Sequence, residues 1–146
     1  MQNQQYHKIA LKKYSMSRSR GLLRIQDSSD LEDMLLDIDW GYDFDNEYYE
    51  EEVENGFYYV INNRNEAIVT DYDGSATNLV IPSTLGGKPV KMIYYSAFTS
   101  LDQLKSVTIS QGVEVIGASA FAACDNLAKV TIPSSVKTID TLAFAL

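Results

Sequence analysis

Residues 104–127 read LKSVTISQGVEVIGASAFAACDNL, and residues 127–144 return to the same pattern as LAKVTIPSSVKTIDTLAF. The dipeptide Ala-Phe occurs at 97–98, 120–121 and 143–144, each time 23 residues after the previous one. The same step relates five further apolar pairs, at 104 and 127, 107 and 130, 109 and 132, 113 and 136, and 116 and 139. A fixed period of this length is typical of a solenoid, in which each repeat stacks on its neighbour.

Charge divides the 146-residue chain into three segments. The net charge is −8, yet residues 1–24 hold six Lys and Arg and no acidic residue, whereas residues 27–54 hold thirteen Asp and Glu and no basic residue. We therefore expect a flexible basic tail over residues 1–26, an acidic helix and linker over residues 27–55, and a repeat domain over residues 56–146.

The acidic segment contains a predicted short helix over residues 29–40. Ser29 and Glu32 form a capping box, in which each side chain bonds a free amide of the first turn. Apolar residues follow at helical spacing and form one stripe, namely Leu31, Met34, Leu35 and Ile38. Acidic and aromatic residues then alternate over residues 42–49, a pattern that suits either a strand or an unfolded linker.

A β-hairpin is predicted over residues 56–72, because two segments rich in β-formers, 57–61 and 67–70, flank a turn-like Asn-Asn-Arg-Asn sequence. A solenoid needs such a cap, since its first unit otherwise presents an open strand edge and bare apolar surface. The third unit stops at Leu146, before its closing leucine. We expect the array to be incomplete there, either by truncation or because that end pairs with another chain.

The repeats resemble the leucine-rich repeats of the BspA-like, or treponemal, family, whose motif is L-x-x-V-x-I-P-x-x-V-x-x-I-G-x-x-A-F-x-x-C-x-x-L. The second unit carries the motif residues Val107, Ile109, Val113, Ile116, Ala120, Phe121, Cys124 and Leu127. The resemblance covers about residues 56–146, and residues 71–90 look like the family's first-repeat entry. It implies an α+β repeat solenoid, a short leucine-rich repeat stack of 23-residue units with short strands and a helical turn.

The residue pattern of each repeat also agrees with elementary physical chemistry. Val-x-Ile alternation suits a short strand with two inward residues, which Pro82 or Pro133 ends because proline cannot donate to the ladder. A second short extended piece follows, and Ser-Ala-Phe is expected to begin a helical or 3₁₀ turn. The phenyl rings of Phe98, Phe121 and Phe144 should then stack in one column.

Two further features follow from the alignment of the units. Lys91, Glu114 and Lys137 occupy equivalent positions, so stacking should place opposite charges side by side. The first unit has five extra residues around 86–89, which should project as a loop.

Residue types for common catalytic and metal sites are scarce. His7 is the one histidine, which argues against Ser-His or Cys-His catalysis and against zinc sites of the Cys/His type. Cys124 is expected to be a buried, inert core residue, because the preceding repeat has leucine there. Asp43, Asp45 and Glu47 alternate like calcium ligands, but the glycine of an EF-hand is missing. We predict a protein that is not an enzyme and binds no cofactor and no metal.

The resemblance implies a non-catalytic module that binds another protein, since the BspA-like family is associated with cell-surface adhesion. The outward strand positions would form part of the binding face, namely Asn78, Val80, Ser106, Thr108, Lys129 and Thr131. Tyr94 and Tyr95 replace small or polar residues of the later units. They either form an exposed binding anchor or pack on the capping hairpin near Phe57 and Tyr59.

A second hypothesis is an intracellular scaffold or regulator, supported by the lack of a secretory signal and by the unpaired Cys124. The acidic helix would then dock in a partner's groove or on the solenoid itself. In both cases the expected partner is a protein, and self-association through the uncapped third unit is an option. We expect neither a nucleic acid, because the basic tail lacks interleaved aromatic residues, nor a membrane span, because no apolar run is long enough. The sequence leaves the compartment open.

Overall fold

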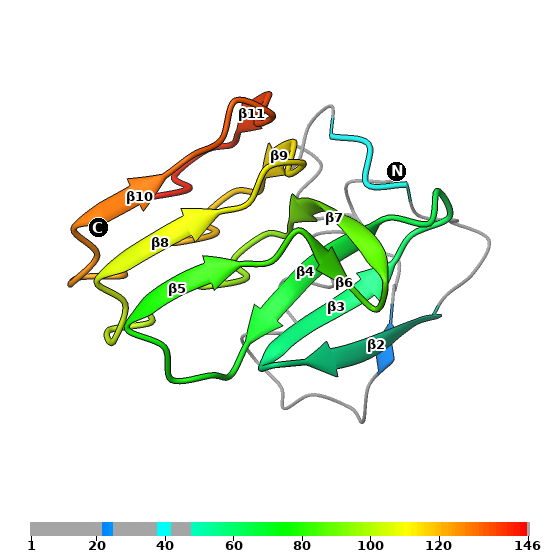
Figure 1. The fold of residues 1–146 in the computed structure, drawn as a ribbon, viewed down its shortest axis with the longest axis horizontal. Coiled ribbons are helices and arrows are strands. Elements are labelled where there is room, and N and C mark those ends of the chain that lie inside the picture. The colour runs from blue at the N-terminus through cyan, green and yellow to red at the C-terminus, as the bar shows by residue number, and fades with distance from the viewer. Residues whose placement is uncertain (1–21, 25–37, 42–47, 146) are drawn as a thin grey trace.

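The computed structural model describes residues 22–24, 38–41 and 48–145, and in it the strands form two sheets that enclose the core (Figure 1). The strands are β1 (Leu22–Arg24), β2 (Tyr48–Glu54), β3 (Phe57–Ile61), β4 (Ala67–Tyr72), β5 (Asn78–Ile81), β6 (Thr84–Leu85), β7 (Lys88–Ile93), β8 (Ser106–Ile109), β9 (Val115–Ile116), β10 (Lys129–Thr131) and β11 (Thr138–Ile139). The larger sheet has the order β1–β2–β3–β4–β7–β9–β11, with β6 paired to β7, and the smaller sheet has the order β5–β8–β10.

About three coils follow one another, and each contributes one strand to each sheet. Equivalent strands pair in parallel, with Val107 of β8 opposite Val130 of β10 and Ile116 of β9 opposite Ile139 of β11. These partners are 23 residues apart, so the sequence period is also the register of the sheets. The predicted repeat solenoid is confirmed.

The third side of each coil consists of stacked turns, so the predicted helical turn and the α+β class are wrong; the described ranges contain no helix. An α-helix would need each amide to bond the carbonyl four residues earlier. Here alternate amides bond the next coil instead: Ser96 N donates to Ala118 O at 3.0 Å, and Phe98 N to Ala120 O at 2.7 Å. Ser96 also has a φ of 57°, a left-handed conformation that ends any helix at once.

The aromatic column that the repeat predicts is confirmed. The rings of Phe98 and Phe121 stack with centroids 4.9 Å apart and planes 4° apart, and those of Phe121 and Phe144 stack at 5.2 Å and 3°. Parallel rings at this spacing follow from identical coils, because each coil places its phenylalanine directly over the previous one.

The predicted hairpin is present as β3 and β4, which pair antiparallel, and it covers the first coil. Phe57 and Tyr72 of this hairpin lie against Phe98, with ring centroids 6.3 and 5.9 Å from it. The cap is larger than the hairpin alone, because β2 pairs antiparallel with β3 and β1 with β2. β4 then pairs in parallel with β7, so the cap and the coils share one continuous sheet.

The extra residues of the first coil form a tight hairpin between β6 and β7. Thr84 lies opposite Pro89 and Leu85 opposite Lys88. Gly86 and Gly87 make the turn with φ of 58° and 73°, a conformation that glycine adopts without steric cost.

Several predicted N-terminal features lie wholly or partly outside the described residues. These are the tail over residues 1–21, most of the acidic helix, and the trio Asp43, Asp45 and Glu47. Residues 38–40, the expected end of the helix, have no regular secondary structure. Within the expected basic tail, residues 22–24 form β1.

Candidate protein-binding face

The outward positions of β5, β8 and β10 form two straight rows across the smaller sheet. The strand registers place Asn78, Ser106 and Lys129 in the first row and Val80, Thr108 and Thr131 in the second. Neighbouring strands in a sheet lie about 4.8 Å apart, so each row spans roughly 10 Å. All six residues that the outward-position argument selected are therefore brought together on one surface, and Figure 1 shows the three strands side by side.

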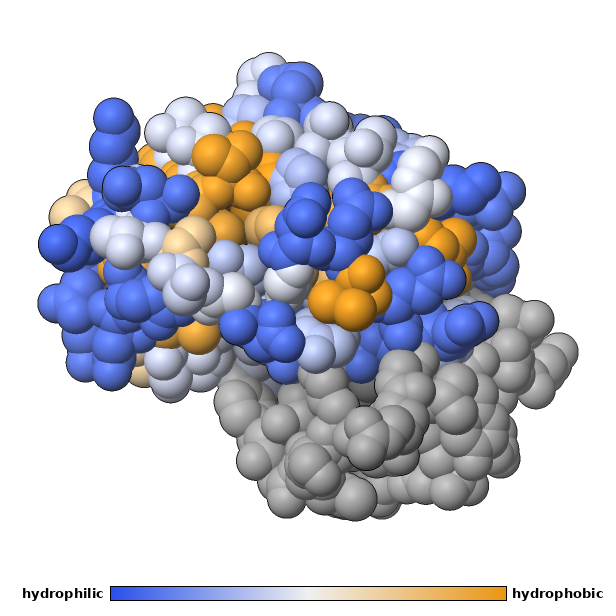
Figure 2. All heavy atoms as spheres, turned by 60° about the horizontal axis from the view of Figure 1, so that its bottom comes forward, coloured by the Kyte–Doolittle hydropathy of each residue, from blue (hydrophilic) through white to orange (hydrophobic). Residues whose placement is uncertain are grey.

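The face combines hydroxyl and amide groups with one cation and one apolar side chain. Val80 is 60% exposed although it is apolar, and Asn78, Thr108, Lys129 and Thr131 are also exposed. The half-buried Ser106 donates its hydroxyl to Asn78 Oδ1 at 2.8 Å, which fixes two members of the first row relative to each other. Figure 2, drawn from the lower side of Figure 1, shows separate apolar patches among hydrophilic residues rather than one continuous apolar surface.

The two tyrosines lie elsewhere. Tyr94 and Tyr95 follow β7 in the larger sheet, and Tyr94 is fully buried, with its ring at 73° to that of Trp40 and 4.9 Å away. Tyr95 is half-buried against the same cluster. Tyr94 therefore packs, as the second reading of the sequence had it, but against Trp40 rather than near Phe57 and Tyr59.

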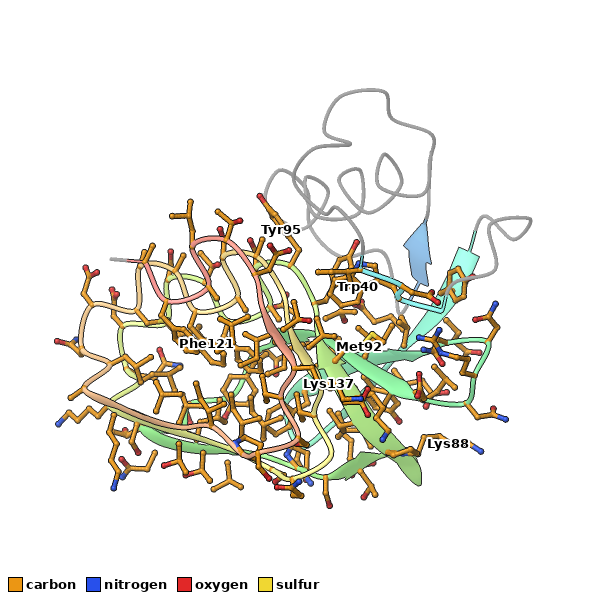
Figure 3. The ribbon with its side chains drawn as sticks, turned by 90° about the horizontal axis from the view of Figure 1, so that it is seen from above. Trp40, Lys88, Met92, Tyr95, Phe121 and Lys137 are labelled. Atoms are coloured by element: carbon orange, nitrogen blue, oxygen red, sulfur yellow. The ribbon has the colours of Figure 1, made fainter. Side chains whose placement is uncertain are left out.

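The sequence placed residues 38–40 at the end of the acidic helix and left open whether that helix docks on the solenoid. In the structure, residues 38–41 pack on the outer face of the larger sheet. Trp40 is completely buried there and lies close to Met92 in Figure 3. The turn between β3 and β4 holds the segment: Asn62 Nδ2 donates to Trp40 O at 3.0 Å, and Arg64 Nη1 donates to Asp39 Oδ2 at 2.8 Å. The acidic segment thus docks, in its described part, on the solenoid itself.

The pKa of the Asp39 carboxyl reflects this anchorage. The amide of Gly41 donates to Asp39 Oδ1 at 2.9 Å, and this bond together with the Arg64 guanidinium lowers the pKa of Asp39 below its ordinary value. A lowered pKa means that the ionised form is the one the contact stabilises. The single tryptophan, Trp40, was the one residue of the sequence that could have pointed to this docked segment.

The charged column is present beside β7, β9 and β11. Lys91 Nζ lies 3.5 Å from Glu114 Oε2, and Lys137 Nζ lies 3.8 Å from Glu114 Oε1. The expected alternation of charge across three coils is confirmed. Exposed pairs of this kind contribute little to stability, so the column mainly favours correct register between coils.

Cys124 is a core residue and not a reactive site. Its thiol is almost completely buried and donates to Phe98 O, with 3.1 Å between sulfur and oxygen. Burial raises the pKa of Cys124, which keeps the sulfur in its unreactive protonated form.

The last coil is open on its outer side in the described part of the chain. Ile132 and Ile139 are 40% and 50% exposed, whereas their counterparts Ile109 and Ile116 are buried. A cavity of about 140 Å³ opens there, lined by Phe121, Cys124, Leu127, Val130 and Phe144 among others.

Over residues 22–24, 38–41 and 48–145, no group of three or more His, Cys, Asp or Glu side chains is placed to hold a metal ion. Within the same ranges no helix has the length and apolar character to cross a membrane.

The coil geometry agrees with a comparison against protein families. The family described as "BspA type Leucine rich repeat region (6 copies)" matches residues 72–146. The chain belongs to this family. The match begins at the last residue of β4 and includes all the coils, so the BspA-type repeats account for the solenoid but not for β1, β2 and β3. Proteins built from such repeats are in general non-catalytic modules that bind other proteins.

Two solved leucine-rich repeat proteins are similar to this chain in structure. The T. pallidum leucine rich repeat protein TpLRR is similar with a TM-score of 0.57 and 30% identity, over 62% of this chain and 42% of TpLRR. A leucine-rich repeat protein from Bacteroides capillosus ATCC 29799 is similar with a TM-score of 0.54 and 25% identity, over 62% of this chain and 87% of that protein. The chain thus corresponds to less than half of TpLRR. No curated protein matches it.

Proposed function

We propose that this chain is a non-catalytic module that recognises another protein through the outward face of β5, β8 and β10. The observation that carries the proposal is the pair of rows in which parallel pairing holds Asn78, Ser106 and Lys129 beside Val80, Thr108 and Thr131. None of the six side chains belongs to the buried core, and only Ser106 is half-buried.

The fixed backbone beneath the six outward side chains supports the proposed binding face. The backbone of each strand is fixed by ladder bonds to its neighbours, and the inward residues between the rows, such as Val107, are fully buried. A partner that binds the face therefore need not order the backbone, which lowers the entropic cost of association. Hydroxyl and amide groups supply directional hydrogen bonds, while Val80 supplies apolar contact.

We further propose recognition at a cell surface, by adhesion to another protein, because the BspA-like family is associated with that role. The alternative is an intracellular scaffold whose acidic N-terminal segment docks to a partner. Fractionation of native cells tests the compartment: the protein in the surface fraction supports adhesion, and the protein in the soluble interior supports the scaffold.

Substitution on the face tests the binding role. The double variant Val80→Glu with Thr108→Glu should abolish cross-linking to a native partner in quantitative mass spectrometry. Thr84→Glu with Thr138→Glu is the matched control, because it adds the same two charges at exposed residues of the other sheet. Equal recovery of the partner by both variants, with unchanged unfolding midpoints, would contradict the proposed face.

A second candidate is self-association through the open side of the last coil, which the exposed Ile132 and Ile139 favour. Stacking of a second copy there would bury these side chains and fill the cavity beside Phe144. Sedimentation velocity should then show a concentration-dependent dimer that Ile139→Lys removes and Thr84→Lys, at an exposed residue of the first coil, does not. A monomer at all concentrations would exclude this candidate without affecting the face on β5, β8 and β10.

A further inference from the structure

The backbone of residues 39–41 is held by one turn of the cap, the turn between β3 and β4. Three successive carbonyl oxygens of this segment each accept one hydrogen bond from that turn. The donors are Arg64 Nη2 for Asp39 O at 3.0 Å, Asn62 Nδ2 for Trp40 O at 3.0 Å, and Asn63 N for Gly41 O at 2.9 Å. Main-chain bonds of this kind hold an extended peptide whatever its side chains are, so they supply affinity rather than specificity.

The side chain of Asp39 is also contacted, by the guanidinium of Arg64. Arg64 Nη1 donates to Asp39 Oδ2 at 2.8 Å, while Arg64 Nε donates to Glu66 Oε1 at 3.0 Å. Glu66 thus fixes the guanidinium with both outer nitrogens bonded to Asp39. A fixed arginine favours a carboxylate over the neutral amide of asparagine, because charge-assisted hydrogen bonds are roughly twice as strong as neutral ones.

Position 41 selects glycine. Gly41 has a φ of 72°, and a Cβ there would lie 2.6 Å from Asn62 Nδ2 and 3.0 Å from Arg64 Cζ. Asn62 cannot move aside without loss, because its Oδ1 accepts hydrogen bonds from Arg64 N at 3.0 Å and from Glu66 N at 2.9 Å. A larger residue at position 41 therefore disturbs the same side chains that hold the two residues before it.

The indole of Trp40 packs on an apolar patch of the larger sheet. The patch consists of described side chains from β3, β4, β7 and the two turns that follow β7 and β9, namely Val60, Ile68, Met92, Tyr94 and Ala118. Trp40 is fully buried, meets the ring of Tyr94 edge-on at 4.9 Å and lies close to Met92 (Figure 3). Edge-on rings and a nearby thioether both favour an aromatic occupant.

The site is built from residues that are ordered by their own contacts. Within the turn, Asn62 N donates to Glu66 O at 2.9 Å and Asn65 N donates to Asn62 O at 3.1 Å. The patch lies on strands that pair with one another, β3 with β4 and β4 with β7. None of these bonds involves residues 39–41, so the site should keep its shape when the segment leaves. A preformed site binds a peptide at a lower entropic cost.

We propose that the β3–β4 turn and the apolar patch form a recognition site for an extended Asp-Trp-Gly segment, and that residues 39–41 are its intramolecular, displaceable ligand. Each residue of the tripeptide meets a separate selection: a guanidinium for the aspartate, an aromatic-lined patch for the tryptophan, and a lack of room for any Cβ at the glycine. The site is independent of the binding face on β5, β8 and β10, which lies in the other sheet.

A fluorescent Ile-Asp-Trp-Gly peptide with blocked ends tests the site in the full chain. Trp40→Ala vacates the patch, so this variant should bind the peptide saturably in anisotropy titrations. The natural chain should bind it at least about tenfold more weakly, because its own segment competes at a high effective concentration. Gly41→Ala supplies a second vacated chain, since its Cβ displaces the segment while the patch stays intact.

Altered peptides test whether the site reads the sequence. Ile-Asp-Trp-Ala should bind the vacated chain at least about tenfold more weakly, through the steric conflict at the last position. Ile-Asn-Trp-Gly should also bind more weakly, and adding Arg64→Met to Trp40→Ala should abolish that preference for aspartate. Lys105→Met is the matched control, because it removes one exposed cation beside the other sheet and should leave the preference unchanged.

A vacated chain that remains folded and does not bind the peptide would overturn the proposal. Unfolding of both vacated chains, seen by circular dichroism, would also overturn it, because the segment would then be part of the core and not a ligand. Equal affinity for the three peptides would refute the recognition of Asp-Trp-Gly, since the patch would then accept any apolar segment.

Discussion

The first and the last described coils of the solenoid carry the same repeat residues in different surroundings. At the first end, the cap of β2, β3 and β4 covers the coil, and Phe57 and Tyr72 lie against Phe98. At the other end, Phe144 is half-buried and Ile139 is half-exposed, although their counterparts one coil earlier are buried. The difference shows that the repeat sets the positions of the side chains, whereas the neighbouring layer sets how much each contributes to stability.

The largest difference between the ends should appear in the aromatic column. Phe121→Ala removes a ring that is buried between two others, and we expect a loss of about 3–5 kcal/mol in the free energy of unfolding. Among the described residues, Phe144 stacks on a ring on one side only, so the loss for Phe144→Ala should stay below about 2 kcal/mol. Urea unfolding measures both variants, and similar losses would mean that the last coil is as well covered as the middle one.

The junction between the first two coils should be sensitive to a single methyl group. A Cβ at Gly117 would lie 2.8 Å from both Ile93 O and Tyr95 N, which are backbone atoms that cannot rotate away. We expect Gly117→Ala to cost about 1–3 kcal/mol in thermal or urea unfolding through overpacking.

Gly112→Ala provides the contrast for this junction. Gly112 has a φ of 109°, and its nearest neighbour to a built Cβ is 3.9 Å away, so alanine there meets backbone strain of about 1–3 kcal/mol but no close contact. A Gly117→Ala variant as stable as the natural chain would show that the coils can separate to admit the methyl group.

The capped end should respond to alkaline pH through Tyr59. Burial, reinforced by the hydrogen bond to Glu52, raises the pKa of Tyr59 to about 12, above the value of about 10 in an unfolded chain. The native state therefore retains the proton longer, and this contribution to stability is complete below about pH 10 and lost as the pH rises to about 12.

Tyr59→Phe isolates that contribution. Its free energy of unfolding should fall less steeply than that of the natural chain between about pH 10 and pH 12, as measured by urea unfolding at several pH values. Parallel curves for the two proteins would show that Glu52 and burial do not perturb this phenol.

The smallest effect is expected in the charged column. Lys91 lies 3.5 Å from Glu114 and is more buried than Lys137, which lies 3.8 Å away. Lys91→Met should therefore cost more than Lys137→Met, although both changes should stay within about 1 kcal/mol. Added salt should reduce the difference between the variants, and an unchanged difference in high salt would point to packing rather than charge.

Much of the solenoid was predictable because its contacts repeat at a fixed sequence distance. The period of 23 residues predicts which residues share a row, and it correctly anticipated the phenylalanine column, the Lys91–Glu114–Lys137 column and the six outward positions on β5, β8 and β10. In a repeat array the neighbour of each residue is its own equivalent, so one local pattern implies the long-range contacts.

Other features depend on contacts that no local pattern encodes. The turns after β7 and β9 were expected to be helical, but their amides bond carbonyls of the next coil. Trp40 was expected to end a helix, yet it packs with residues of β3, β4 and β7, which come later in the chain. Tyr94 was expected either to be an exposed anchor or to pack near Phe57 and Tyr59, and it packs instead against the same tryptophan.

The sequence by itself determined that this chain forms BspA-type coils and which side chains face inward, because both follow from apolar residues recurring at a constant step. The tertiary structure alone decided how the first coil is covered, where the acidic segment docks and which tyrosine remains at the surface. The physical reason is that a coil specifies its own neighbours through repetition, whereas a cap is unique and its contacts join residues far apart in the chain.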